Sequence, residues 1–157
     1  MKRIAGYRGA MLLYLCLFAA GVLAAGWLLR FQVLKVGNEG PCVRVSEGDV
    51  ISLQFTHSMY GVPVEERLRV EGRRMMLFHV VTSDAALEYY GIEGRGEGNA
   101  KREIDRFSIP RGSVGGQTLL VRNRRIVLRD LPGGQESVTI RLAREPILLH
   151  VAHCIWR

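Results

Sequence analysis

The sequence predicts an all-β fold, a small antiparallel sandwich or partly open barrel, preceded by one N-terminal transmembrane helix. Residues 10–29 form an uncharged run of twenty residues, which in a helix spans the roughly 30 Å hydrocarbon core of a bilayer. The rest of the chain consists of short segments of alternating apolar and polar residues, separated by Gly and Pro turns. Because such alternation is typical of half-buried strands, these segments favour a sandwich or a barrel.

The charges before the apolar run set its expected orientation. Lys2, Arg3 and Arg8 precede the run, and this positive bias favours a cytoplasmic N-terminus over residues 1–9. The chain after the run then lies on the outer side of the membrane, which in a Gram-negative bacterium is the periplasm. We therefore expect a single-pass protein of the bacterial inner membrane with a periplasmic C-terminal domain.

A cleaved signal peptide is the alternative interpretation of residues 10–29. Ala24 and Gly26 stand three places and one place before Trp27 and fit a loose cleavage pattern. The run is long for a signal peptide, whose apolar part is roughly 7–15 residues, so a retained anchor is favoured. Cleavage would give an exported and soluble domain, and both interpretations export the same residues.

The exported part is expected to be one domain. The chain has 157 residues, and we assign residues 30–40 to a linker and residues 41–157 to an extracytoplasmic β domain large enough to bury a core. The formal net charge is +7, but no basic run of the kind that binds nucleic acid occurs. We therefore expect no nucleic-acid partner.

The chain has three cysteines, and two of them bear on the compartment. Cys16 lies inside the apolar run and is expected to be inert. Cys42 and Cys154 stand near the two ends of the exported domain, where an oxidising compartment favours a disulfide between them. Closing so long a loop would stabilise the fold by on the order of 4–5 kcal/mol. Two free thiols are the alternative.

A hairpin begins the predicted sheet. Residues 49–57 and 64–70 alternate between apolar and polar side chains, and residues 58–61 between them form a turn. Residues 75–82 form a third strand that is apolar enough to be central. The further predicted strands are residues 104–109, 118–122, 125–128, 137–142 and 147–154.

Two stretches break the strand pattern. Residues 84–90 have helical propensity and are expected to make one or two helical turns. Residues 91–99 contain four glycines and are predicted to form a flexible loop. These glycines lack the spacing of a dinucleotide-binding fingerprint, so they give little support to a phosphate-binding role.

The hairpin carries the densest group of reactive side chains. In the register that places Val64 opposite Phe55, His57 and Glu66 point to the inner face of the hairpin. A buried carboxylate costs several kcal/mol unless it is paired. His57, an arginine or a backbone amide should therefore meet Glu66.

Two interpretations of this group stay open. In the structural one, Glu66 binds turn amides and His57 closes the hairpin. In the functional one, the end of the sandwich forms a small polar pocket that recognises an anion or a loop of a partner. His57 and Ser58 do not form a catalytic dyad, because adjacent strand residues point to opposite faces, and no nucleophile elbow occurs. We therefore expect no enzymatic activity.

The segment Glu88, Tyr89 and Tyr90 is a second candidate for binding. It places two aromatic rings beside an acid in an irregular part of the chain. Such a segment suits a binding edge and equally suits a plug that closes the sandwich.

The C-terminal histidines do not predict a metal site. In a strand, His150 and Cys154 share one face while His153 takes the other, so the three side chains do not converge. His79 lies in an apolar strand, where a histidine is more often structural than a ligand. We therefore expect no metal and no cofactor.

The hairpin and two later segments carry a family resemblance. The residues concerned are His57, Ser58, Pro63, Val64 and Glu66, followed by residues 86–91 and 124–128. The first set resembles the HS-x4-PV-x-E pattern of the DUF 1850 family, and the later segments are similar to other parts of that family. The resemblance implies a short secreted or membrane-anchored protein that accompanies TRAP transporters of the TAXI type. It implies no catalytic residue, and it makes His57, Ser58, Pro63 and Glu66 the positions to test.

We therefore expect an accessory or interaction protein of a solute transporter, which the resemblance makes TRAP-type. The turn at residues 58–62, which contains Tyr60, and residues 88–90 would form the surface that contacts the permease or its solute-binding protein. The alternative is a periplasmic module that binds a small organic acid through His57, Glu66 and a nearby arginine.

Overall fold

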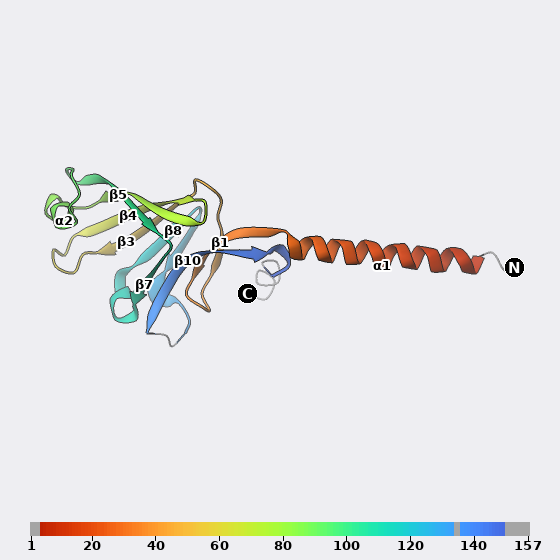
Figure 1. The fold of residues 1–157 in the computed structure, drawn as a ribbon. Helices are drawn as coiled ribbons and strands as arrows, with labels where there is room; N and C mark the ends of the chain where they lie inside the picture. The colour runs from red at the N-terminus through yellow and green to blue at the C-terminus, as the bar shows by residue number, and fades with distance from the viewer. Residues whose placement is uncertain (1–3, 134–135, 150–157) are drawn as a thin grey trace. The chain divides into compact units, whose positions relative to one another are not determined.

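The chain folds into two units in the computed structural model, which describes residues 4–133 and 136–149. The first unit contains the helix α1 (Ile4–Leu28) and the described residues from Arg144 onward, and the second contains Gln32–Ala143 (Figure 1). In α1, the segment Met11–Leu28 has a mean hydropathy of 2.1. At about 1.5 Å per residue, this helix is long and apolar enough to cross a membrane, as predicted.

The β part of the chain is a sandwich of two antiparallel sheets, as predicted. The four-stranded sheet has the order β2-β1-β10-β7, and the six-stranded sheet has the order β6-β5-β4-β3-β8-β9. The strands are β1 (Arg30–Val36), β2 (Cys42–Arg44), β3 (Val50–Thr56), β4 (Pro63–Glu71), β5 (Arg74–Val81), β6 (Glu97–Ile104), β7 (Arg106–Pro110), β8 (Thr118–Val121), β9 (Arg124–Val127) and β10 (Ser137–Pro146). The other described elements are α2 (Asp84–Tyr89) and two 3-10 turns, η1 (Arg111–Gly116) and η2 (Leu128–Asp130).

Side chains from both sheets form the core. On β4, Val64, Leu68 and Val70 are buried on one face. Val36 and Ile140 of the four-stranded sheet are fully buried in the same hydrophobic cluster. The period-two alternation of the sequence therefore places one face of β4 inside the sandwich, as expected for a half-buried strand.

The predicted hairpin is confirmed together with its register. Phe55 of β3 pairs with Val64 of β4, and Leu53 pairs with Glu66. Because alternate strand residues share a face, Glu66 lies on the same inner face as Val64 and Leu68.

The predicted linker is wrong, because residues 30–40 contain a strand. β1 occupies Arg30–Val36 and pairs with β2 in the four-stranded sheet. Val33 and Leu34 are adjacent and both fully buried. The segment therefore lacks the alternation that reveals a half-buried strand in a sequence.

The predicted flexible loop is shorter than expected and closely packed. β6 begins at Glu97, and Gly94 forms a bridge with Gly98. A side chain at Gly98 would collide with Ile92 and with the carbonyl oxygen of Glu93. These glycines therefore allow close backbone approach rather than flexibility.

β6 itself is absent from the predicted strands. Gly98 is the single buried residue in its burial pattern, because β6 is an edge strand whose other side chains are exposed or half-buried. A strand with so little apolar character is formed by pairing with β5 rather than by its own propensity. The strand predicted over residues 104–109 corresponds to β7, which begins at Arg106.

The end of the chain differs from the predicted last strand. β10 continues to Pro146, and residues 147–149 are helical. Residues 150–154 lie outside the described residues, so the strand predicted there is untested. Cys154 is among them, and its disulfide with Cys42 of β2 therefore stays a prediction.

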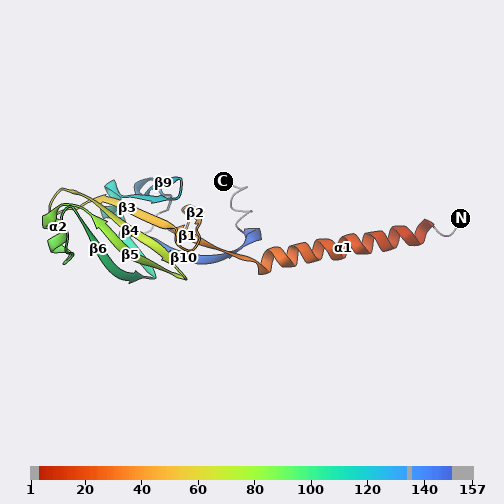
Figure 2. The same ribbon diagram turned by 90° about the horizontal axis from the view of Figure 1, so that it is seen from above.

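Different structural features lie at the two ends of the six-stranded sheet. At one end, Nε2 of Gln32 donates to the carbonyl of Gly72 in the β4–β5 turn (2.7 Å), and the Gly72 N–H donates to the Glu47 carboxylate (2.7 Å). At the other end, the β3–β4 turn lies beside α2 (Figure 2). The nine residues of β4 separate the two ends by about 30 Å, at about 3.3 Å per residue.

Candidate functional site

Three hydrogen bonds close the turn between β3 and β4. The backbone N–H of His57 donates to the Val62 carbonyl (2.8 Å), and the Gly61 N–H donates to the His57 carbonyl (2.8 Å). The Met59 N–H donates to Nδ1 of the His57 ring (3.3 Å), so a neutral ring carries its proton on Nε2. This geometry supports the structural interpretation, in which His57 closes the hairpin.

The predicted helical segment is confirmed as α2, and its start is capped. Ser83 is the N-cap residue, and its Oγ accepts a hydrogen bond from the Ala86 N–H (3.3 Å). Leu87, on the next turn, is buried in the hydrophobic core. The cap and this buried side chain anchor the helix to the sandwich.

The end of α2 is fixed by a glycine. Gly91 has a φ of +67°, a left-handed conformation that favours glycine. Its N–H donates to the Glu88 carbonyl (2.9 Å), and the Ile92 N–H donates to the Leu87 carbonyl (2.9 Å). These two bonds form a Schellman motif, which sets the direction of the chain at Tyr90.

His57 lies at the centre of an aromatic cluster, which we define as His57, Tyr60, Tyr89 and Tyr90. The ring centroids of the three tyrosines lie 5.1, 5.5 and 5.6 Å, respectively, from that of His57. Tyr89 also packs edge-on against Tyr60 and Tyr90, at 6.2 and 5.8 Å. Edge-to-face aromatic pairs contribute about 0.5–1.5 kcal/mol each beyond their burial. The fold thus brings together predicted residues from two separate segments.

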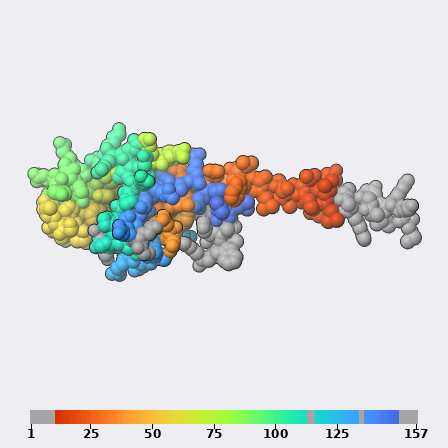
Figure 3. Space-filling model, turned by 60° about the horizontal axis from the view of Figure 1, so that its bottom comes forward, coloured from red at the N-terminus to blue at the C-terminus, as the bar shows by residue number. Residues whose placement is uncertain are grey.

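The tyrosines of the cluster reach solvent although His57 is buried. His57 is 8% exposed, whereas Tyr60, Tyr89 and Tyr90 are 40%, 58% and 37% exposed, and Met59 beside them is 65% exposed. We call Met59, Tyr60, Tyr89 and Tyr90 the aromatic surface. Figure 3 shows the turn (yellow) and α2 (green) side by side at this end of the sandwich. This exposure favours a binding edge over a plug for residues 88–90.

Glu66 lies behind the aromatic surface, on the inner face of β4. Its cross-strand neighbours are Leu53 of β3 and Val80 of β5, both buried. Burial raises the pKa of the Glu66 carboxyl above its usual value, and the positive charge of Arg102 opposes this shift. Arginine is one of the partners that the sequence predicts for Glu66, and Arg102 is the arginine whose positive charge acts on it.

Tyr90 connects Glu66 with the aromatic cluster. Burial raises the pKa of the Tyr90 hydroxyl, and the nearby charge of Glu66 and the Tyr89 hydroxyl raise it further. Glu66 is therefore close enough to Tyr90 for its charge to act on the Tyr90 hydroxyl.

A hollow of about 480 Å³ opens beside Glu66 at the β6–β7 corner. Its lining residues are Glu66, Leu68, Arg102, Glu103, Ile104, Asp105, Arg106 and Phe107. We call it the Glu66 hollow. The far wall of the hollow is not evident from the sequence, because β6 lacks the apolar alternation of a strand. The inward Glu66 predicts a nearby partner, which could be His57, an arginine or a backbone amide, but it does not say which.

Ser58, Pro63 and Glu88 surround the aromatic cluster. Ser58 and Glu88 are exposed. Pro63 begins β4, and its carbonyl accepts a hydrogen bond from the Thr82 hydroxyl (3.0 Å). This bond ties the start of β4 to the segment before α2, and it holds the two halves of the aromatic cluster together.

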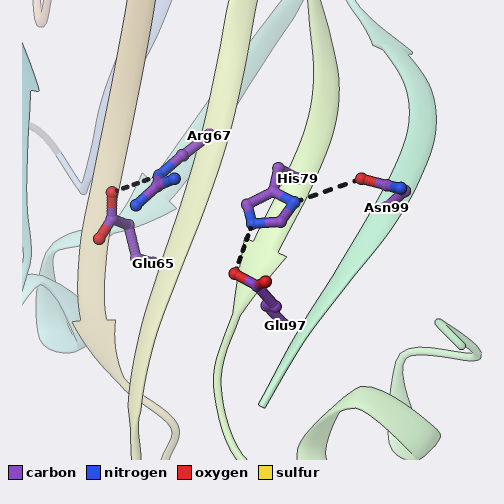
Figure 4. A network of polar contacts seen from close by, with 5 residues as sticks. All are labelled: Glu65, Arg67, His79, Glu97 and Asn99. Carbon is purple, nitrogen blue, oxygen red and sulfur yellow. Dashed lines mark hydrogen bonds and ion pairs between the residues drawn. The ribbon is translucent and has the colours of Figure 1, made fainter. Parts of the chain in front are cut away.

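His79 belongs to a different group, on the outer face of the same sheet (Figure 4). Its Nδ1 lies 3.3 Å from the Asn99 side-chain oxygen, and its Nε2 lies 3.3 Å from the Glu97 carboxylate. On the neighbouring strand, Nε of Arg67 donates to the Glu65 carboxylate (2.8 Å). This interaction with Arg67 is the first cause of the lowered pKa of Glu65. These five residues form a polar network that covers β4, β5 and β6.

Comparison with known protein families, curated proteins and solved structures finds no match to this chain. The resemblance to the DUF 1850 family therefore stays a prediction. Within residues 4–133 and 136–149, no three His, Cys, Asp or Glu side chains are grouped so that they could hold a metal ion. His150 and His153 lie outside these residues.

Proposed function

We propose that this chain is a membrane-anchored accessory protein whose β-sandwich docks onto a protein component of a solute transporter. The observation that carries this proposal is the aromatic surface, where Tyr60, Tyr89 and Tyr90 are exposed but held by fixed backbone. The proposal assigns no catalytic step to the chain.

The physical character of the aromatic surface suits protein recognition. Tyrosine presents a large apolar ring with a polar hydroxyl and is enriched among the residues that dominate binding energy at interfaces. It also loses little conformational entropy on binding, because it has two side-chain torsions. Here the turn hydrogen bonds and the Schellman motif already fix the backbone of both halves, which further reduces the ordering cost of association.

The partner is proposed from the resemblance and from α1. The DUF 1850 resemblance points to a TRAP transporter, with either its permease or its solute-binding protein as the docking partner. An anchor of this kind raises the effective concentration of the domain near a partner in the same membrane. Modest affinity at the aromatic surface would then be sufficient for assembly.

The proposed location follows from the same anchor. Lys2, Arg3 and Arg8 support a cytoplasmic N-terminus and a periplasmic sandwich. Labelling of a Ser58→Cys variant in intact cells with a thiol reagent that does not cross membranes tests this orientation. We expect Ser58→Cys to be labelled from outside after the outer membrane is permeabilised. Labelling only after lysis of the inner membrane would contradict the orientation.

Co-purification tests the docking surface. The full-length chain is captured from detergent-solubilised host membranes, and co-purified proteins are quantified by mass spectrometry. We expect a transporter permease or a solute-binding protein to be recovered. A Tyr60→Ala/Tyr89→Ala variant should recover roughly tenfold less of it, because truncating two exposed anchors removes binding energy.

Val50→Ser is the matched control for this experiment. Val50 is 41% exposed and stands at the opposite end of β3 from His57, so this substitution also removes exposed apolar surface. Recovery with Val50→Ser should equal that of the natural chain. Equal recovery with the tyrosine variant, or recovery of no transporter component by a folded chain, would contradict the proposal.

A further inference from the structure

The Glu66 hollow has the size and the lining of a small-molecule site. Its volume of about 480 Å³ lies within the range of roughly 300–1,000 Å³ that is common for ligand pockets. Leu68, Ile104 and Phe107 supply apolar walls, and Glu66 and Arg102 bring a carboxyl and a guanidinium group to the same space. Apolar walls with a few convergent polar groups are the usual composition of such sites.

Two arginines of the hollow are able to recognise an anion. Glu103 and Asp105 both form ion pairs with Arg74, which does not line the hollow; the Arg74–Asp105 distance is 3.2 Å. Arg74 therefore offsets one of these two negative charges. Arg102 and Arg106 remain as two guanidinium groups in the lining, and guanidinium binds carboxylates with two parallel hydrogen bonds.

The remaining acid, Glu66, is less suited to bind a cation than a solvent-exposed carboxylate. It lies on the inner face beside Leu53 and Val80, and this burial favours its neutral form. A cationic ligand would meet two arginines and a carboxyl whose charged form is disfavoured.

We propose that the Glu66 hollow binds a small monocarboxylate with an apolar body. Arg102 binds the carboxylate, and the apolar body packs against Leu68, Ile104 and Phe107. This site goes beyond the docking role, since it does not use Tyr60 or Tyr89.

Fluorine NMR of a matched pair of probes tests the site. The full-length chain in lipid nanodiscs is titrated with 4-fluorobenzoate and, separately, with 4-fluorobenzylamine, at a neutral pH where the first is an anion and the second is a cation. We expect 4-fluorobenzoate to bind and 4-fluorobenzylamine not to bind. Binding of the amine alone, or binding of neither probe at roughly millimolar concentration, would overturn the proposal.

Three variants locate the bound probe. Arg102→Gln should weaken 4-fluorobenzoate binding roughly 10- to 100-fold, because it removes a charge-assisted pair of hydrogen bonds. Glu66→Gln should bind at least as tightly as the natural chain, because the amide offers an N–H donor and has no negative charge. Arg125→Gln, at an exposed position of β9, is the control and should leave binding unchanged.

Other results from these variants would contradict the site. Unchanged binding in Arg102→Gln would place the probe elsewhere, and loss of binding in Glu66→Gln would require an ionised Glu66. Circular dichroism verifies that each variant is folded. The docking role is tested separately, since Arg102→Gln should keep the transporter component and Tyr60→Ala/Tyr89→Ala should keep probe binding.

Discussion

Glu65 and Glu66 are neighbours on β4, yet the two faces of the sheet give them opposite chemistry. Glu65 points to the outer face, where its carboxylate accepts a hydrogen bond from Arg67 (2.8 Å), and its pKa is lowered chiefly by that bond. Glu66 points to the inner face between Leu53 and Val80, and burial raises its pKa. One residue type thus has two roles, because successive strand residues face opposite environments.

The difference separates a carboxyl that stabilises the fold from one that opposes it. The outer carboxylate takes part in a network with ordinary partners, and its negative charge is favourable there. The inner carboxyl is held where its charged form is disfavoured, so the fold would be more stable with an uncharged residue at this position. Ionisable groups in such positions are frequently functional, which is the reason that Glu66 rather than Glu65 stands at the centre of the candidate site.

The largest expected effect is a loss of side-chain packing, which should cost more on the inner face of the sheet than on the outer face. Leu68→Ala on the inner face should lower the free energy of unfolding by about 2–5 kcal/mol, because Leu68 is 1% exposed and the change leaves a cavity. Arg69→Ala on the outer face removes a contact between its guanidinium and the Phe78 ring, 4.5 Å from the centroid, and should cost about 0.5–1 kcal/mol. Urea unfolding of the full-length chain followed by circular dichroism measures both changes. Equal losses would show that the two faces are not energetically distinct.

Glu66→Gln should increase the free energy of unfolding. A carboxyl and an amide have nearly the same shape, so the substitution leaves no cavity, and the change should be smaller than the loss in Leu68→Ala. With a pKa raised in the folded state, Glu66 disfavours folding as the pH rises from its usual pKa of 4.5 through the raised one. The variant lacks this titration, so its advantage should grow as the pH rises above 4.5 and vanish below about pH 4.5. Thermal unfolding of both proteins across this range tests the sign. A destabilised Glu66→Gln at neutral pH would mean that the ionised carboxylate is well paired.

The position of Glu66 on the inner face of the sheet can be predicted largely from the sequence. The alternation of β3 and β4 fixes the register in which Phe55 meets Val64, and that register places Glu66 inside. The need of a buried carboxyl for a partner predicts His57, an arginine or a backbone amide, but it does not single out Arg102. That residue lies on β6, whose polar sequence shows no apolar alternation, so the pairing of β6 with β5 depends on tertiary structure.

The aromatic cluster shows a similar limit. Tyr60 and Tyr89 can each be proposed from the sequence as a binding residue, because each stands in an irregular, aromatic segment. Their contact at 6.2 Å depends on the position of α2 beside the β3–β4 turn. That position is set by the burial of Leu87 and by the hydrogen bond from Thr82 to Pro63, which are long-range interactions that no local pattern encodes.

Glu65→Gln tests the outer face of the sheet, where we expect the substitution to lower the free energy of unfolding rather than to raise it. The Arg67 ion pair is partly exposed, so its loss should cost about 0.2–1 kcal/mol at neutral pH. Because the folded state lowers the pKa of Glu65, its stabilising effect is present above the usual pKa of 4.5 and is lost as the pH falls through the lowered one. The loss of stability in Glu65→Gln should therefore disappear in acid. A loss that grows in acid would contradict the ion pair between Glu65 and Arg67.

The smallest expected effect concerns His79, on the outer face beside the same network. His79 contacts Asn99 and Glu97 at 3.3 Å and is paired across the sheet with Arg67. His79→Gln keeps a polar side chain that can donate and accept, so the free energy of unfolding should change by less than about 0.5 kcal/mol. An outer polar group is thus replaceable by another, whereas at Glu66 replacing the carboxyl by an amide changes stability and its pH dependence together. A His79→Gln loss as large as that of Leu68→Ala would show that the outer network is a second structural core, and the contrast between the two faces would fail.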